Sequence, residues 1–301
     1  MNVQLRPHLV ALALLGSALA ASSAGGQVPA PQPDRPHPVE AWLSGAVAPL
    51  TPAGTLTTSY PPEVALISGA EGRLGQALTL EPSVGRGVEL GLNVFPAPAI
   101  GLQVFASRVS ADVGGSNTPF EIALRYVTRP PPDNVPTQVS VARSVEWPVT
   151  VGGLRQWAIG AGPAARWHRR GVAVVASGGL AWVRLEGEAQ PLGYTTFRLG
   201  GHSVLFEESY RVGATLGPTS VLAGFVSGSI DVSLARHVAA TMGLRVLLTG
   251  DAELPATIDT IVDATAGLSP PPPADVNRRM APLLARQSPQ RLALTVGVKV
   301  R

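Results

Sequence analysis

Cysteine is absent from this chain of 301 residues. Without thiols there is neither a disulfide framework nor a thiolate metal site, so stability has to come from burial, backbone hydrogen bonds or a surrounding membrane. Charged residues are also scarce, at 14% of the chain against about 25% in an ordinary soluble domain. The charges of the 23 basic and 20 acidic residues nearly cancel, and the basic residues form no evident cluster in the sequence. Both features argue against a nucleic-acid partner.

Long apolar runs are missing as well. After residue 20 no stretch reaches the roughly 18 apolar residues that identify a membrane helix, although hydrophobic residues make up 45% of the chain. Such a chain has to enclose a large apolar core or present apolar side chains to lipid on one face of each strand. The pattern of its strands decides between these two solutions.

The N-terminus has the pattern of a secretory signal peptide. Arg6 precedes an apolar run at 9–15, and the small-residue sequence Ala18-Leu19-Ala20 is a plausible cleavage site. A short buried helix is the alternative interpretation. We therefore predict three parts: a signal peptide at 1–20, a Pro-rich periplasmic leader at 21–38 and a β-barrel at 39–301.

Apolar and polar residues alternate with period two through much of the remaining chain, which is the spacing of a strand with two different faces. At 221–235, for example, the even positions are apolar or glycine, and the odd positions include Ser227, Ser229 and Asp231. Runs of about eleven residues exceed the usual soluble strand and match a tilted membrane-spanning strand. The alternating segments are 39–50, 87–95, 99–110, 154–167, 171–185, 221–235, 238–248 and 292–301.

The connections between these segments alternate in length. Tight links at 96–98, 168–170 and 236–237 are separated by long segments at 51–84, 111–153, 186–220 and 249–290. Outer-membrane barrels have short periplasmic turns and longer extracellular loops. The predicted fold is therefore all-β: an eight-stranded antiparallel up-and-down transmembrane β-barrel with long extracellular loops. A soluble periplasmic lipocalin-like barrel is the alternative.

Two further segments, around 120–126 and 139–147, alternate in the same way and leave ten strands as an alternative. We predict instead that 120–147 forms an extracellular hairpin, because Arg143 would otherwise face lipid at a cost of about 2–4 kcal/mol near the bilayer midplane. In the last long segment, 275–286 has the composition of a short helix, which Pro282 disfavours.

Three tryptophans match an aromatic girdle. Trp157 and Trp167 share one face of one predicted strand, ten residues apart. At about 3.3 Å per residue and a tilt of roughly 40°, this spacing rises about 25 Å, the height of the apolar band whose edges carry aromatic residues. Trp182, near the outer end of the next strand, fits the same girdle. The alternative is that the spacing of Trp157 and Trp167 is a coincidence.

The predicted inward faces carry polar residues of mixed sign. The lumen of an eight-stranded barrel is just wide enough to be filled by side chains, and a buried charge without a partner is costly, so we predict a structural polar network. A narrow conduit or small-ligand cavity is the alternative, for which inward glycines such as Gly91, Gly160 and Gly243 would leave space. The predicted network residues are Glu89, Gln103, Gln156, Arg166, Asp231, Arg245 and Lys299.

A catalytic constellation is poorly supported. His168 and His237 fall in predicted tight turns, where histidines are usually solvated. His202, Ser203 and the glutamates at 207–208 form a hydrolase-like set, which makes a lipid-modifying barrel enzyme an alternative. Catalysis needs a nucleophile, base and orienting group in hydrogen-bonded geometry, which neighbouring loop residues seldom supply. We therefore expect no enzyme activity, no metal and no cofactor.

The stretch Leu234-Ala235-Arg236-His237-Val238 with its flanking strands, together with the closing segment 292–301, resembles the OmpA/OmpW-like superfamily of small outer-membrane β-barrel proteins. The likeness extends over 39–301 as a pattern. It implies a monomer in the outer membrane of a Gram-negative envelope, surrounded by outer-membrane lipid and placed there by the barrel-insertion machinery. The expected function is structural or loop-mediated, or the porin-like passage of a small solute.

Overall fold

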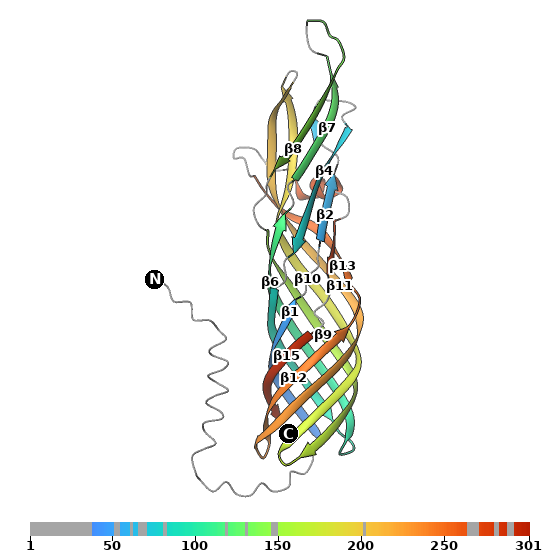
Figure 1. The fold of residues 1–301 in the computed structure, drawn as a ribbon, viewed down its shortest axis with the longest axis vertical. Helices are drawn as coiled ribbons and strands as arrows, with labels where there is room; N and C mark the ends of the chain where they lie inside the picture. Colours follow the sequence, from blue (N-terminus) through green and yellow to red (C-terminus); the bar gives the residue numbers. More distant parts are fainter. Residues whose placement is uncertain are drawn as a thin grey trace, which may run out of the picture. The chain divides into compact units, whose positions relative to one another are not determined.

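Eight antiparallel strands close into a ring in the computed structural model of the chain (Figure 1). Each strand pairs with the next one in chain order, and β15 pairs with β1 to complete the ring. This arrangement confirms the predicted eight-stranded up-and-down barrel. The ring strands are β1 (Val39–Leu50), β5 (Ser83–Val94), β6 (Ile100–Asn117), β9 (Thr150–Arg169), β10 (Val172–Gly200), β11 (Ser203–Ala235), β12 (Val238–Leu248) and β15 (Leu292–Val300).

The structure describes residues 38–50, 55–60, 63–65, 71–80, 83–117, 120–129, 132–145, 150–200, 203–263, 271–279, 283–287 and 292–301. All of them belong to one unit, residues 36–301. The predicted signal peptide, and the predicted leader up to residue 37, lie outside the described residues.

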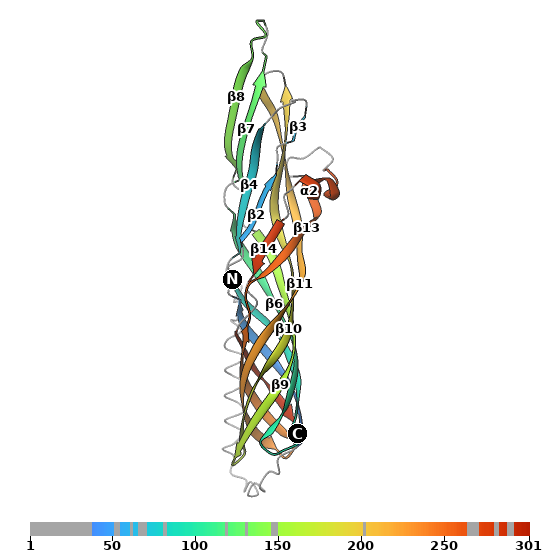
Figure 2. The same ribbon diagram turned by 90° about the vertical axis from the view of Figure 1, so that its right-hand side faces the viewer.

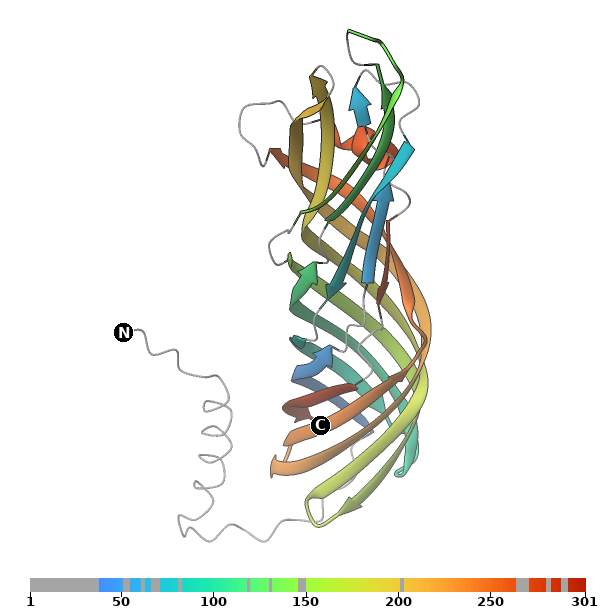
Figure 3. The ribbon, with the colours of Figure 1, turned by 45° about the horizontal axis from the view of Figure 1, so that its top comes forward.

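The two faces of the ring differ in polarity as the alternation predicted. Along β15, Leu294, Val296 and Val298 point outward and are exposed, whereas Thr295 and Lys299 point inward and are buried. This order is the reverse of a soluble barrel, in which apolar side chains fill the interior and polar ones meet water. Successive residues of a strand face opposite sides, so a two-residue repeat in the sequence separates the two environments. Figure 3, tilted toward the viewer, shows the ring strands wrapping around the interior.

Short turns join the ring strands at one end, which we call the turn end. The link between β5 and β6 covers 95–99, and Arg236 and His237 join β11 to β12, both as predicted. The third turn differs from the prediction: it consists of Arg170 and Gly171, while His168 belongs to β9. Both turn residues have positive φ, +48° and +78°. Two-residue hairpin turns of this kind require that conformation, and glycine adopts it readily.

The long segments opposite the turn end contain more regular structure than loops. Strands β10 and β11 continue through 186–220, where Tyr194 pairs with Tyr210 and Gly200 with Ser203. The remaining elements lie beyond the ring (Figure 2). They are β2 (Thr55–Tyr60), β3 (Glu63–Ala65), β4 (Glu71–Leu80), β7 (Phe120–Thr128), β8 (Thr137–Val145), β13 (Ala252–Asp263), α2 (Pro273–Arg279) and β14 (Leu283–Gln287).

Two of these elements test predictions from the sequence. Strands β7 and β8 pair with each other, and β7 pairs with β4 rather than with a ring strand. The described parts of the segment, β7 and β8, therefore form a hairpin outside the ring, and the ring has eight strands rather than ten. The predicted helix at 275–286 is shorter than expected: α2 ends at Arg279, and 283–287 forms β14. Pro273 starts α2, a position that suits proline because the first helical N–H needs no partner.

Candidate functional site

Paired charges fill the interior of the ring near the turn end. Arg166 of β9 forms an ion pair of 2.8 Å with Glu40 of β1, and Lys299 of β15 forms one of 2.5 Å with Asp231 of β11. Glu40 joins the two pairs, because its other oxygen lies 3.6 Å from the Lys299 ammonium. Arg301 also approaches Glu40, at 3.6 Å. Four strands that are distant in sequence are thereby connected across the lumen.

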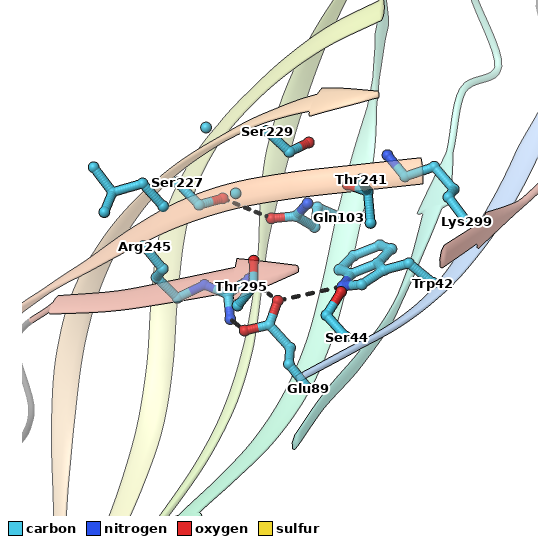
Figure 4. A pocket seen from close by; sticks show the side chains of 13 residues that line it. Trp42, Ser44, Glu89, Gln103, Ser227, Ser229, Thr241, Arg245, Thr295 and Lys299 are labelled. Atoms are coloured by element: carbon cyan, nitrogen blue, oxygen red, sulfur yellow. Dashed lines mark hydrogen bonds and ion pairs between the residues drawn. The ribbon is translucent and has the colours of Figure 1, made fainter. Parts of the chain in front are cut away.

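A second cluster lies further along the lumen (Figure 4). Glu89 of β5 and Arg245 of β12 form an ion pair, and the Trp42 indole N–H donates a hydrogen bond of 3.2 Å to Glu89. The guanidinium carbon of Arg245 lies 3.3 Å from the centroid of the Phe105 ring. Phe105 in turn meets Phe225 edge to face, with ring centroids 5.0 Å apart. The charge pair is thus enclosed by aromatic rings rather than by solvent.

Amides and hydroxyls extend the first cluster along the lumen. The Gln103 amide donates to Asn93, at 3.2 Å, and Asn93 donates to Glu40, at 3.5 Å. The hydroxyls of Ser177 and Ser227 donate to the Gln103 carbonyl oxygen, at 2.5 and 3.0 Å. Inward side chains of β5, β6, β10 and β11 therefore share one hydrogen-bonded chain. Such a chain favours a single arrangement of the lumen, because every buried polar atom in it depends on its neighbours.

The structure places all seven residues of the predicted network in the lumen, where each is buried. Six of them make the contacts given above, and Gln156 borders a small cavity beside Glu89 and Arg245. Sequence reasoning missed Glu40, Trp42 and Asn93, although they lie in segments whose alternation was identified. Extending the inward parity of those segments to every position would have found all three.

The lumen has little free space between these side chains. Two cavities lined by network residues each have a volume of about 20 Å³, which is enough for one water molecule. The inward glycines do not leave a passage. A Cβ atom added to Gly91 would lie 2.1 Å from the Trp42 ring, and one added to Gly160 would lie 2.4 Å from the Phe105 ring. These glycines make room for aromatic side chains.

The interior changes character away from the turns. We call the part of the ring that contains the charged clusters the turn-side half, and the part beyond Trp157 and Trp182 the loop-side half. In the loop-side half most inward side chains are apolar, with Gln156 as a buried polar exception, and most of the apolar ones belong to one core. Their outward neighbours on β9 and β10 include the charged Arg155, Arg184 and Glu186. The core includes Leu154, Val183, Leu185, Val212 and Leu216.

The three tryptophans of the predicted girdle point to the outside of the ring. Trp157, Trp167 and Trp182 are 38%, 60% and 42% exposed. Trp157 and Trp167 lie at opposite ends of the apolar outer face of β9, and the guanidinium of Arg108 stacks over the Trp157 ring at 4.9 Å. Their position at a membrane interface stays a prediction.

Two of the five histidines lie among the residues that the structure describes. His168 and His237 are exposed at the turn end, Ser203 begins β11, and His202 lies outside the described residues, so the hydrolase-like alternative stays a prediction. Within the described ranges, no group of three or more His, Cys, Asp or Glu side chains is placed to hold a metal ion. In the same part of the chain, no helix has the length and apolar character needed to cross a membrane.

Comparison with known proteins gives similarity in structure alone. No family model and no curated protein matches the sequence. The outer membrane protein OprG from Pseudomonas aeruginosa is similar, with 10% identity, a TM-score of 0.39 and coverage of 87% of this chain and 94% of that one. Ail, the attachment invasion locus protein of Yersinia pestis, has 9% identity and a TM-score of 0.29, covering 87% and 99%. The outer membrane protease OmpT from Escherichia coli has 8% identity and a TM-score of 0.33, covering 88% and 97%.

All three are small outer-membrane β-barrel proteins. At identities of 8–10%, the similarity concerns the fold and not the function.

Proposed function

We propose that this chain is a monomeric, non-enzymatic outer-membrane β-barrel with a filled lumen, which holds its additional strands outside the membrane as an interaction region. The apolar outer face of the turn-side half supports the membrane location. Contiguous apolar surface of this extent is costly in water and favourable in lipid. Every ring strand contributes to it, through exposed side chains such as Leu43, Leu90, Leu102, Ile159, Leu180, Leu222, Leu244 and Val296.

The filled lumen rests on one observation above all, the pair of Glu89 and Arg245 enclosed by Trp42 and Phe105. A conduit would need these side chains to separate and leave two charges in a narrow apolar surrounding. Removing one partner of a buried ion pair typically costs about 3–5 kcal/mol. The charged groups of this network are paired with one another, so we assign it to the stability of the barrel rather than to transport.

Fractionation tests the membrane location. The full chain, expressed in a Gram-negative host, is expected in the outer-membrane fraction, and the unboiled protein is expected to migrate differently from the boiled protein in gels. A protein that is recovered soluble from the periplasm, with no such shift, would instead support the lipocalin-like alternative.

Planar-bilayer conductance tests the filled lumen. We expect no steady single-channel events from the purified barrel, because paired side chains occupy the interior. Regular conductance steps from the wild-type protein would contradict this expectation and favour the passage of a small solute.

A further inference from the structure

Four neighbouring ring strands carry an outward arginine at the loop-side edge of the apolar outer face. They are Arg86 on β5, Arg108 on β6, Arg155 on β9 and Arg184 on β10, and we call them the arginine crescent. Arg108, Arg155 and Arg184 each lie two residues beyond the last outward apolar position before them, whereas Arg86 lies between the outward Val88 and Val84. The strand register holds them together, because Trp157 pairs with both Arg108 and Arg184. At this edge, the described outward positions of β11, β12, β15 and β1 carry no arginine.

Carboxylates lie further from the apolar face than the arginines of the same strands, two residues beyond Arg184 for Glu186 and four residues beyond the arginine for Asp112 and Glu188. Asp112 follows on β6, and Glu186 and Glu188 follow on β10. Glu186 is partly engaged by Arg184, at 3.6 Å. With about 3.3 Å per residue along a strand, each two-residue step corresponds to roughly 7 Å. Across β6, β9 and β10 the outer surface therefore changes from apolar to a row with Arg108 and Arg184. The next row has Arg155 beside Glu186, and the one after it has Asp112 and Glu188.

A groove runs between these outward arginines and carboxylates. Its volume is about 560 Å³, and Arg108, Asp112, Arg155, Glu186 and Glu188 are among the residues that line it. Two features shape its floor and one wall. Gly153, beside the outward Glu188, leaves the floor free of a side chain at that point, and a register shift leaves Gly217 and Pro218 of β11 opposite a single residue of β10. The site is therefore a concave surface rather than a scatter of exposed charges.

We propose that this groove binds the headgroup of a lipid that carries a phosphate next to its acyl chains and a primary ammonium group beyond the phosphate. The proposal rests on the membrane location proposed above. Guanidinium groups bind phosphate oxygens through paired, charge-assisted hydrogen bonds. The carboxylates further from the apolar face attract the ammonium and repel a second phosphate, so the surface selects an aminophospholipid over a purely anionic one. The acyl chains lie along the apolar face below Trp157 and Trp182.

Lipid retention tests this assignment. The full barrel is reconstituted in bilayers with equal amounts of phosphatidylethanolamine and phosphatidylglycerol of the same acyl chains, extracted in mild detergent and examined by native mass spectrometry. We expect several-fold more bound phosphatidylethanolamine than phosphatidylglycerol. The double substitution Arg108→Gln with Arg155→Gln is expected to reduce retention of both lipids. The double substitution Glu186→Gln with Glu188→Gln is expected to remove the preference between them.

A matched control removes two exposed arginines from the opposite edge, by Arg169→Gln with Arg170→Gln, and is expected to leave retention unchanged. Equal retention of both lipids by the wild-type protein, or the same loss in the control, overturns the proposal. Heat-modifiable mobility is measured in parallel for every variant. A barrel that inserts and shows no preference overturns the headgroup site alone, whereas a chain that never inserts overturns both this proposal and the membrane location.

Discussion

The turn-side and loop-side halves of the ring have opposite polarity although the same strands build both. In the turn-side half of β10, Val174 points outward and Ser177 points inward to Gln103. In its loop-side half, Leu185 points inward and Glu186 points outward. The parity of the strand does not change between the two halves. What changes is the kind of residue on each face. In the proposed membrane location, this change places the arginine crescent at the boundary between lipid and water.

The difference also separates two ways of stabilising a barrel interior. The turn-side half depends on paired charges whose partners must all be present, whereas the loop-side half depends on apolar burial, as a soluble protein does. A substitution that one half tolerates should therefore destabilise the other half. The following experiments compare the costs in stability.

The largest effect is expected from breaking the central ion pair. Arg245→Ala leaves Glu89 buried without a cation, and we expect a loss of about 3–5 kcal/mol in the free energy of unfolding. Urea titration of the reconstituted barrel, followed by tryptophan fluorescence, measures it. The double substitution Glu89→Leu with Arg245→Met is expected to recover most of this loss, since apolar residues of similar volume often replace a buried pair without cost. A double variant as unstable as the single one would contradict this account.

A smaller effect is expected from an arginine on the outer face. Val226→Arg places a charge in the middle of the apolar face of β11, and we expect a cost of about 2–4 kcal/mol. Gln190→Arg on β10 is outward and exposed in the loop-side half, where surface substitutions usually change stability by less than about 0.5 kcal/mol. The same titration compares the two variants, and equal costs would remove the distinction between the halves.

Helix α2 provides a still smaller effect outside the ring. The Asn277 side chain accepts a hydrogen bond from the backbone N–H of Ile258 and donates one to its carbonyl oxygen, both 2.8 Å long. It thus replaces a neighbouring strand at that point of β13. Asn277→Ala leaves both backbone groups unpaired, at about 1–3 kcal/mol for a buried group. Hydrogen exchange at the Ile258 amide should become faster in the variant, while the amides of the turn-side half keep their protection.

The smallest effect concerns acid pH in the loop-side region. Hydrogen bonds donated by the hydroxyls of Thr215, at 2.5 Å, and Thr260, at 2.7 Å, lower the pKa of Asp259 below its usual value. A lowered folded-state pKa contributes stability that is complete above the unfolded pKa and is lost as the pH falls through the folded one. Thr215→Val should therefore raise the pKa of Asp259 in a carboxyl-carbon NMR titration. An unchanged titration would show that the Thr215 hydroxyl has no such influence.

The ring could be predicted from the sequence because alternation is a local property of each strand. The contacts of the lumen could not, because Arg166 and Glu40 are 126 positions apart and meet only through the stagger of the closed ring. The sequence also fails to predict the loop-side continuations of β10 and β11, which its pattern indicates as a long loop. Their apolar residues point inward and their charges outward, and Gly217 and Pro218 interrupt the register, so the pattern seen nearer the turns stops.

The absence of cysteine allows the most direct test, since each introduced thiol is unique. Single cysteines replace Val174 and Leu180 on the outward turn-side face of β10, Glu186 and Gln190 on its outward loop-side face, and Val183 inside. In reconstituted barrels, a water-soluble thiol reagent should modify the cysteines at 186 and 190 rapidly and leave those at 174, 180 and 183 unmodified. Fluorophores attached in detergent at 174 and 180 should be quenched by nitroxide lipids. Rapid modification at all four outward positions would contradict a lipid-facing turn-side half.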